Sequence, residues 1–236
     1  MPYETPRVKL LAIDTATEAC SVSLSIGDGR IDRYVELERG HAERVLPMVE
    51  SVLAEAGIRL AALDAIAFGR GPGGFTGVRL AASVVQGLAF GAGVGVVPIS
   101  DLSAVAMRAR DLRPEARRIL VANDARMREV YWAEFPASDL LRPVAGEHVG
   151  PPDQVAIAHS EDVWLAAGRG LRAWPDLSAR CQTAGAVLFE DLLPRASEIL
   201  ELARPLVAAR QVLDPAEAVP VYVRDRVAEP AVIKLT

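Results

Sequence analysis

The chain has 236 residues and a mass of 25.2 kDa, enough for one large domain or for two modest lobes that each bury a core. Hydrophobic residues make up 51% of it and aromatic residues only 5%, so Ala, Val, Leu and Ile must form the core. The net charge of −5 and the pI near 5.3 exclude the basic footprint that unaided binding to a nucleic-acid backbone requires.

Cysteine usage and hydropathy indicate the compartment. Cys20 and Cys181 lie far apart and outside any Cys-x-x-Cys pair, so the sequence predicts neither a zinc site nor a disulfide framework. The N-terminal residues show no basic-then-apolar leader, and the apolar run from Val84 to Ile99 is interrupted by Gln86, glycines and Pro98. We therefore expect a cytoplasmic protein that does not span a membrane.

The first half of the chain alternates between predicted strands and helices. In chain order these are strands at 8–13, 19–26 and 30–37, a helix at 40–56, a strand at 65–68, a helix at 78–92, a strand at 95–99 and a helix at 102–110. Gly57 should end the first helix, and Pro47 should kink it or move its start towards Glu43. Polar residues around Pro114 suggest a boundary between two lobes.

The second half repeats the opening of the chain. Its predicted elements are strands at 119–124, 129–135 and 163–167, one or two helices across 184–209 that break at Pro194 and Pro205, and an extended tail at 219–224. A strand ending in Asp, a turn and a second strand thus occur twice, at Asp14 and at Asp124. This duplication predicts an α/β protein with an actin-like (ASKHA) fold, in which two related lobes of mixed β-sheet are flanked by helices. We expect lobes at 1–112 and 113–236, with the tail from about residue 214 returning to the first lobe.

The turn D-T-x-T at residues 14–17 has two interpretations. Hydroxyl groups and backbone N–H groups at a strand turn suit phosphate oxygens or a metal, which makes Asp14, Thr15, Thr17 and Asp124 candidates for a nucleotide cleft. Alternatively, the side chains tie the turn to its own backbone.

The loop at residues 69–77 is rich in glycine and precedes a helix. It lacks the Gly-Lys-Ser/Thr of a Walker loop, so a sharp strand-to-helix crossing packed against another backbone explains it better than phosphate binding does. The glycines assigned this structural role are Gly71, Gly73, Gly74 and Gly77.

The helix after this loop is apolar on two opposite faces. Val78, Ala82 and Val85 mark one face, and the Ser83, Gly87 and Gly91 row on the other would let a second helix approach closely. The alternatives are a subunit interface, which we favour, and burial within the same chain. The preceding helix carries a similarly wide apolar arc, so both helices could form half of a four-helix bundle with a partner. The expected interface residues are Leu46, Val49, Leu53, Leu80, Ser83, Val84, Gly87, Phe90 and Gly91.

Catalytic equipment is sparse in the sequence. The three histidines, His41, His148 and His159, have no metal-ligand spacing, and no nucleophile motif is present. We predict no catalytic residue and no metal site.

Four blocks of the sequence stand out: LAIDTATEACSVSL at 11–24, HAERVLPMVESVLAEAG at 41–57, GPGGFTGVR at 71–79 and VPVYVR at 219–224. Together they resemble the TsaB (YeaZ-like) family of threonylcarbamoyladenosine biosynthesis proteins. The resemblance implies an actin-like fold and a heterodimer with a catalytic paralogue, TsaD, which transfers threonylcarbamoyl to the adenosine beside the anticodon of ANN-reading tRNAs. It also implies that the first two helices bind this partner and that an ATPase, TsaE, joins the complex.

The same resemblance argues against catalysis by this chain. The metal motif of the catalytic paralogue, His-x-x-x-His, falls on Asp101 and Val105 here, and valine cannot bind a metal. We therefore expect a non-catalytic scaffold or activating subunit that binds no cofactor by itself, with ATP or ADP possible in the complex. It would contact tRNA only through the complex and form a homodimer when alone. The rival hypothesis is an actin-fold ATPase or kinase that uses Asp14 and Asp124; a protease role has no support in the sequence.

Overall fold

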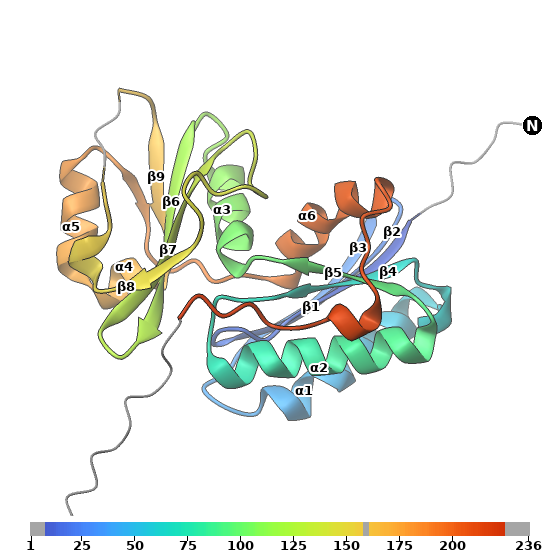
Figure 1. Cartoon of the computed structure of the whole chain (residues 1–236). Helices are drawn as coiled ribbons and strands as arrows, with labels where there is room; N and C mark the ends of the chain where they lie inside the picture. The colour runs from blue at the N-terminus through green and yellow to red at the C-terminus, as the bar shows by residue number, and fades with distance from the viewer. Residues whose placement is uncertain (1–7, 158–160, 225–236) are drawn as a thin grey trace, which may run out of the picture.

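Two five-stranded mixed sheets form the frame of the molecule (Figure 1). The structure, a computed structural model, describes residues 8–157 and 161–224. The first sheet contains β1 (Lys9–Asp14), β2 (Ala19–Ile26), β3 (Gly29–Glu36), β4 (Ala65–Gly69) and β5 (Gly95–Ile99). The second contains β6 (Arg118–Arg126), β7 (Glu129–Pro136), β8 (His148–Gly150), β9 (Trp164–Ala167) and β10 (Val187–Phe189).

The two sheets share one topology. Their strand orders are β3-β2-β1-β4-β5 and β8-β7-β6-β9-β10. In each, the first three strands pair antiparallel and the last two add in parallel. Because the two sheets have the same strand order and strand directions, and an Asp lies at the end of β1 and near the end of β6, the predicted duplication and the actin-like fold are confirmed.

Six helices cover the sheets in layers. They are α1 (His41–Ala56), α2 (Phe75–Ala92), α3 (Asp101–Leu112), α4 (Arg169–Ala173), α5 (Pro175–Thr183) and α6 (Ala196–Ala208). Helices α1 and α2 pack on the outer face of the first sheet, and α4 and α5 on the outer face of the second. Helices α3 and α6 lie between the sheets in one continuous core. Three short 3-10 segments, Leu60–Ala62, Pro152–Gln154 and Pro215–Glu217, complete the described elements.

The two inner helices are exchanged between the lobes. Helix α3 packs on β6, β7 and β9 of the second sheet, whereas α6 packs on β1, β2, β4 and β5 of the first. At the start of α6, the Ala196 N–H donates a hydrogen bond to Ser21 Oγ at 2.9 Å. The strands of the first sheet lie between residues 9 and 99 and those of the second between residues 118 and 189, and α6 then packs on the first sheet.

The tail binds both lobes. Val96 and Leu213 exchange two backbone hydrogen bonds of 2.9 Å, which extends the first sheet beyond β5. Farther on, the Val221 N–H donates to the Arg70 carbonyl at 2.8 Å, and Arg224 forms an ion pair with Glu129 of the second lobe. The segment up to residue 224 thus crosses from one lobe to the other.

Several local expectations were wrong. Helix α2 begins at Phe75, not at Val78, because the glycine-rich loop already turns into the helix at Gly74. Residues 184–195 contain β10 instead of a helix, and the helices α4 and α5 were not predicted. Pro47 lies inside α1 and Pro205 lies inside α6. Neither proline sets the start or the end of its helix. Each proline removes one backbone hydrogen bond, and burial of the neighbouring apolar side chains outweighs that loss.

Candidate functional site

The glycine-rich loop packs directly on the turn that follows β1. The Gly74 N–H donates to the Ala16 carbonyl at 2.7 Å, and Thr15 Oγ1 donates to the Gly77 carbonyl at 2.7 Å. A Cβ at Gly73 would lie 2.5 Å from the Ala16 oxygen, and one at Gly77 would overlap the Thr15 oxygen. The close approach of two backbones that the glycine spacing predicted is therefore present.

Gly71 has a different role in the same loop. Its φ of +100° lies in the left-handed region that favours glycine, and a Cβ there would meet the Val221 carbonyl at 3.0 Å. The loop thus also makes room for the tail.

Asp14 lies beneath the cleft between the lobes, not in it. It has no exposed surface, and its Oδ1 accepts a hydrogen bond from the Ala16 N–H at 2.9 Å. Its neighbour is Asp101 at the start of α3, which is equally buried and accepts from the Gly71 N–H at 2.6 Å. Asp14 is therefore not available to a nucleotide in this structure.

Asp14 and Asp101 form a buried pair of carboxyl groups. Asp14 Oδ2 and Asp101 Oδ1 have no hydrogen-bond partner among the described residues. Burial raises the pKa of Asp14, and burial together with the nearby Asp14 carboxylate raises the pKa of Asp101 well above its usual value. Asp101 is thus buried within the fold, and Val105 is buried in the same helix, α3.

The remaining cleft candidates hold their own turns. Thr17 Oγ1 accepts from the Ala19 N–H at 3.2 Å, and the Thr17 carbonyl lies 2.9 Å from His41 Nε2. Asp124 Oδ1 accepts from the Arg126 N–H at 3.0 Å. The interpretation of these residues as turn-forming groups is the one that the hydrogen bonds favour.

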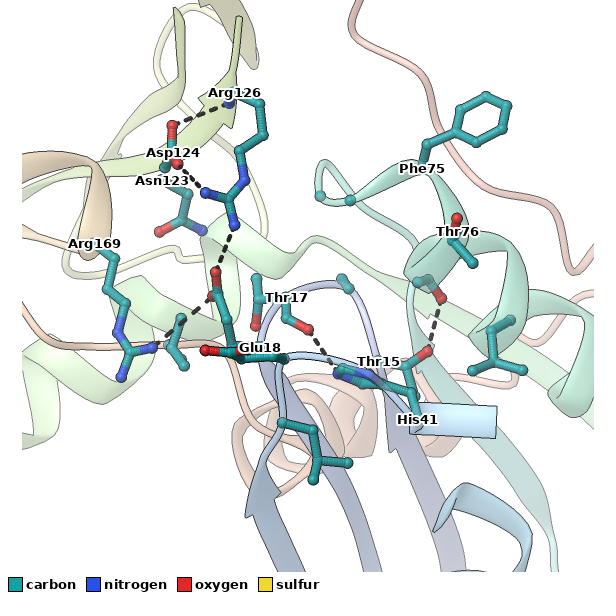
Figure 2. A pocket seen from close by; sticks show the side chains of 18 of the residues that line it. Thr15, Thr17, Glu18, His41, Phe75, Thr76, Asn123, Asp124, Arg126 and Arg169 are labelled. Atoms are coloured by element: carbon teal, nitrogen blue, oxygen red, sulfur yellow. Dashed lines mark hydrogen bonds and ion pairs between the residues drawn. The ribbon is translucent and has the colours of Figure 1, made fainter. Parts of the chain in front are cut away.

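A cleft of about 860 Å³ separates the two Asp-bearing turns (Figure 2). Arg126 bridges it: its guanidinium lies 3.0 Å from Glu18 of the first lobe and 3.1 Å from Asp124 of the second. Arg169, at the start of α4, bonds Glu36 at 2.6 Å and lies 3.9 Å from Glu18. These arginines connect residues of the two lobes across the cleft.

Asn123, Arg126 and Arg169 escaped the sequence-based prediction. Asn123 is 4% exposed, lines the cleft, and has no hydrogen-bond partner for either amide atom among the described residues. Its position directly before Asp124, and that of Arg169 inside Gly-Arg-Gly, were the available signals. Neither signal distinguishes a cleft residue from a turn residue without the second lobe in place.

The second candidate surface is the outer face of α2. Val78, Ala81, Ala82, Val85 and Ala89 are buried against the sheet, so α2 is a partly buried core helix of the first lobe. Its length and composition alone would also suit a membrane span.

The opposite face of α2 is open. Ser83, Gly87 and Gly91 are exposed, and a Cβ at Gly87 or Gly91 would meet nothing within 4 Å. Phe90 is 59% exposed beside them, while Leu80 and Val84 are half-buried. An apolar helix face with a smooth row of small residues remains uncovered in the monomer.

Helix α1 contributes less to this surface than expected. Leu46 is 44% exposed and Leu53 is half-buried, as an interface requires. Val49 is only 2% exposed and packs into the core with Val45 and Val52. The assignment of Val49 to the interface was wrong, because its side chain points at the sheet.

The duplicated sheets and the cleft between them define a protein of the actin-like class. Residues 35–169, more than half of the 236-residue chain, match the family model described as TsaD: tRNA N6-adenosine threonylcarbamoyltransferase. The chain is 41% identical over 228 residues to the tRNA threonylcarbamoyladenosine biosynthesis protein TsaB of Escherichia coli K12, an alignment that covers 94% of this chain and 96% of that protein.

Two further relatives agree. The TsaB protein of Haemophilus influenzae is 37% identical over 227 residues, covering 92% of this chain and 94% of that protein. The solved structure of YeaZ from Pseudomonas aeruginosa superposes with a TM-score of 0.80 at 42% identity, covering 91% of this chain and 99% of that chain. The chain belongs to the TsaB (YeaZ) family of tRNA threonylcarbamoyladenosine biosynthesis proteins, which is related to the TsaD family.

Proposed function

We propose that this chain is a non-catalytic subunit that activates the TsaD paralogue by dimerising with it and helps to recruit the ATPase TsaE. The assembled complex would add threonylcarbamoyl to the adenosine beside the anticodon of ANN-reading tRNAs in the cytoplasm. The observation that carries the proposal is the open apolar face of α2, where Gly87 and Gly91 leave room for a second helix. When alone, the chain would pair with a second copy through the same face.

The polar groups near the cleft support a role without catalysis. Asp14 and Asp101 are buried and accept hydrogen bonds from the Ala16 and Gly71 N–H groups, and Glu18 is paired with Arg126. A group that acts in catalysis must reach the reacting atoms, and these carboxylates face protein donors instead. An ATPase or kinase that used Asp14 and Asp124 would have to break the buried pair first. Nucleotide in the complex is therefore better held by other chains or at the subunit interface.

Replacing Gly87 with Leu tests the interface. The side chain would project into open space in the monomer, so the variant should fold as the original does, while its bulk would keep the partner helix at a distance. We expect its dissociation constant for the purified TsaD paralogue, measured by titration calorimetry, to rise about tenfold or more.

Ala208→Leu provides the matched control, since Ala208 is also an exposed small residue of a helix, in the last turn of α6. This variant should bind as the original chain does. Unchanged affinity of Gly87→Leu would remove α2 from the interface.

A further inference from the structure

An exposed aromatic–arginine cluster lies where the tail crosses the N-terminal end of α2. We give this name to Phe75, Arg79 and Tyr222. Phe75 is 53% exposed and Tyr222 is 48% exposed. The centroids of their rings lie 6.4 Å apart, and the ring planes are tilted by 37°. Figure 2 shows the Phe75 side chain pointing away from Glu18 and the other cleft residues. Phe75 also lines the cleft, but none of the three residues takes part in the ion pairs of Arg126 and Arg169 that bridge the lobes.

Arg79 lies on these rings without an acidic partner. Its guanidinium carbon is 3.2 Å from the centroid of Phe75 and 5.2 Å from that of Tyr222. Within residues 8–157 and 161–224, no carboxylate forms an ion pair with Arg79, whereas Arg126, Arg169 and Arg224 are all paired. The ring contacts hold the guanidinium in place, and no ion pair takes up its N–H edges within the described residues.

The fold fixes the cluster in position. Phe75 and Arg79 are one helical turn apart on α2, so their side chains stack along the same face. Tyr222 is held from both sides, by the hydrogen bond of Val221 to the Arg70 carbonyl and by the contacts of Arg224 with Glu129 and the Ala125 carbonyl. A hollow of about 320 Å³ adjoins it, lined by apolar parts of Phe75, Val78, Met127, Val221 and Tyr222.

We propose that the aromatic–arginine cluster binds an unpaired RNA base and its adjacent phosphate. Exposed ring faces suit stacking with a base, and an unpaired guanidinium suits the phosphate beside it. An RNA phosphate beside a chain with a net charge of −5 needs a local cation, and Arg79 supplies one at this place. The inference rests on the proposed function, in which the complex acts on tRNA; the contact would add to the binding of RNA by the complex.

The test uses the complex of the full chain with the TsaD paralogue and an unmodified transcript of an ANN-reading tRNA. Phe75→Ala, Tyr222→Ala and Arg79→Ala should each weaken RNA binding about 5- to 50-fold in fluorescence anisotropy. Arg79→Ala should also lower the slope of log Kd against log salt by about one, and Phe75→Ala should leave that slope unchanged. Arg142→Ala, whose side chain is 88% exposed on the second lobe, is the control and should bind RNA normally.

Association of the two protein chains is measured in parallel. If the variants keep RNA affinity but lose affinity for the paralogue, the cluster docks a protein and our inference is wrong. If neither affinity changes, the inference is wrong as well.

Failure of the original chain to bind the paralogue would contradict the proposed function instead. In that case, photocrosslinking of the chain alone to a 4-thiouridine oligonucleotide decides: adducts at Phe75 or Tyr222 support the inference, and their absence overturns it.

Discussion

Gly77→Ala should destabilise the chain by about 3 kcal/mol or more, because the new methyl group would overlap the backbone oxygen of Thr15. Neither backbone can move away easily: Thr15 is buried, and its hydroxyl is bonded to the carbonyl of Gly77 itself. Urea unfolding followed by circular dichroism measures the change in the free energy of unfolding.

The same substitution ten residues later provides the control. Gly87 lies in the middle of the same helix, and a Cβ there meets nothing within 4 Å. Gly87→Ala should therefore stabilise the isolated chain by about 0.5–1 kcal/mol, the usual gain from replacing a helical glycine with alanine. Equal effects at both positions would contradict the close packing of the glycine-rich loop on the β1 turn.

Asp101→Asn should reduce the fall in stability that we expect of the original chain as the pH rises. The pKa values of Asp14 and Asp101 are raised in the folded state, so the folded chain binds more protons than the unfolded chain above pH of about 4. Stability is then highest at the acidic end and decreases as the pH rises through the raised pKa values. His41 and Arg70, the positive or titratable groups nearest the pair, lower these pKa values but do not reverse the shift.

An asparagine at position 101 can reproduce the singly protonated pair. Its oxygen can accept from the Gly71 N–H and its amide can donate to Asp14, so we expect it to be more stable than the original chain at pH 8 by about 1–3 kcal/mol. Asp101→Ala leaves the Gly71 N–H without an acceptor and should be less stable at pH 5. Asp111→Asn, at an exposed carboxylate of the same helix, is the control for charge. A pH profile of unfolding that Asp101→Asn leaves unchanged would refute the raised pKa of Asp101.

The strands and the duplication could be predicted because they leave local traces in the sequence. Alternating side chains mark β2 and β7, and the two Asp-bearing turns recur at equivalent places. The glycine-rich loop was interpreted correctly for a similar reason. The spacing of its glycines indicates that another backbone segment packs closely on the loop, and this holds without knowing which segment it is. Helices α4 and α5 are short and weakly apolar, so no such trace exists for them.

The cleft could not be predicted because its properties come from contacts distant in sequence. Asp14 looked like a phosphate-binding residue, but the fold buries it near Asp101, which comes from another element. Likewise, Val49 belongs to an apolar arc wider than one sheet contact needs, and only the packed sheet decides which part of the arc is buried. Arg126 and Arg169 are ordinary arginines in sequence and become bridges only when the second lobe faces Glu18.

The central claim, that this chain activates a catalytic partner through α2 and performs no chemistry itself, is tested most directly by reconstitution. Purified TsaD paralogue and TsaE are assayed for threonylcarbamoyl transfer to an unmodified ANN-reading tRNA, alone, with this chain, and with its Gly87→Leu variant. We predict transfer with this chain, a large loss of transfer with Gly87→Leu, and none from this chain without the paralogue. Full transfer in the absence of this chain, or transfer by this chain alone, would contradict the account.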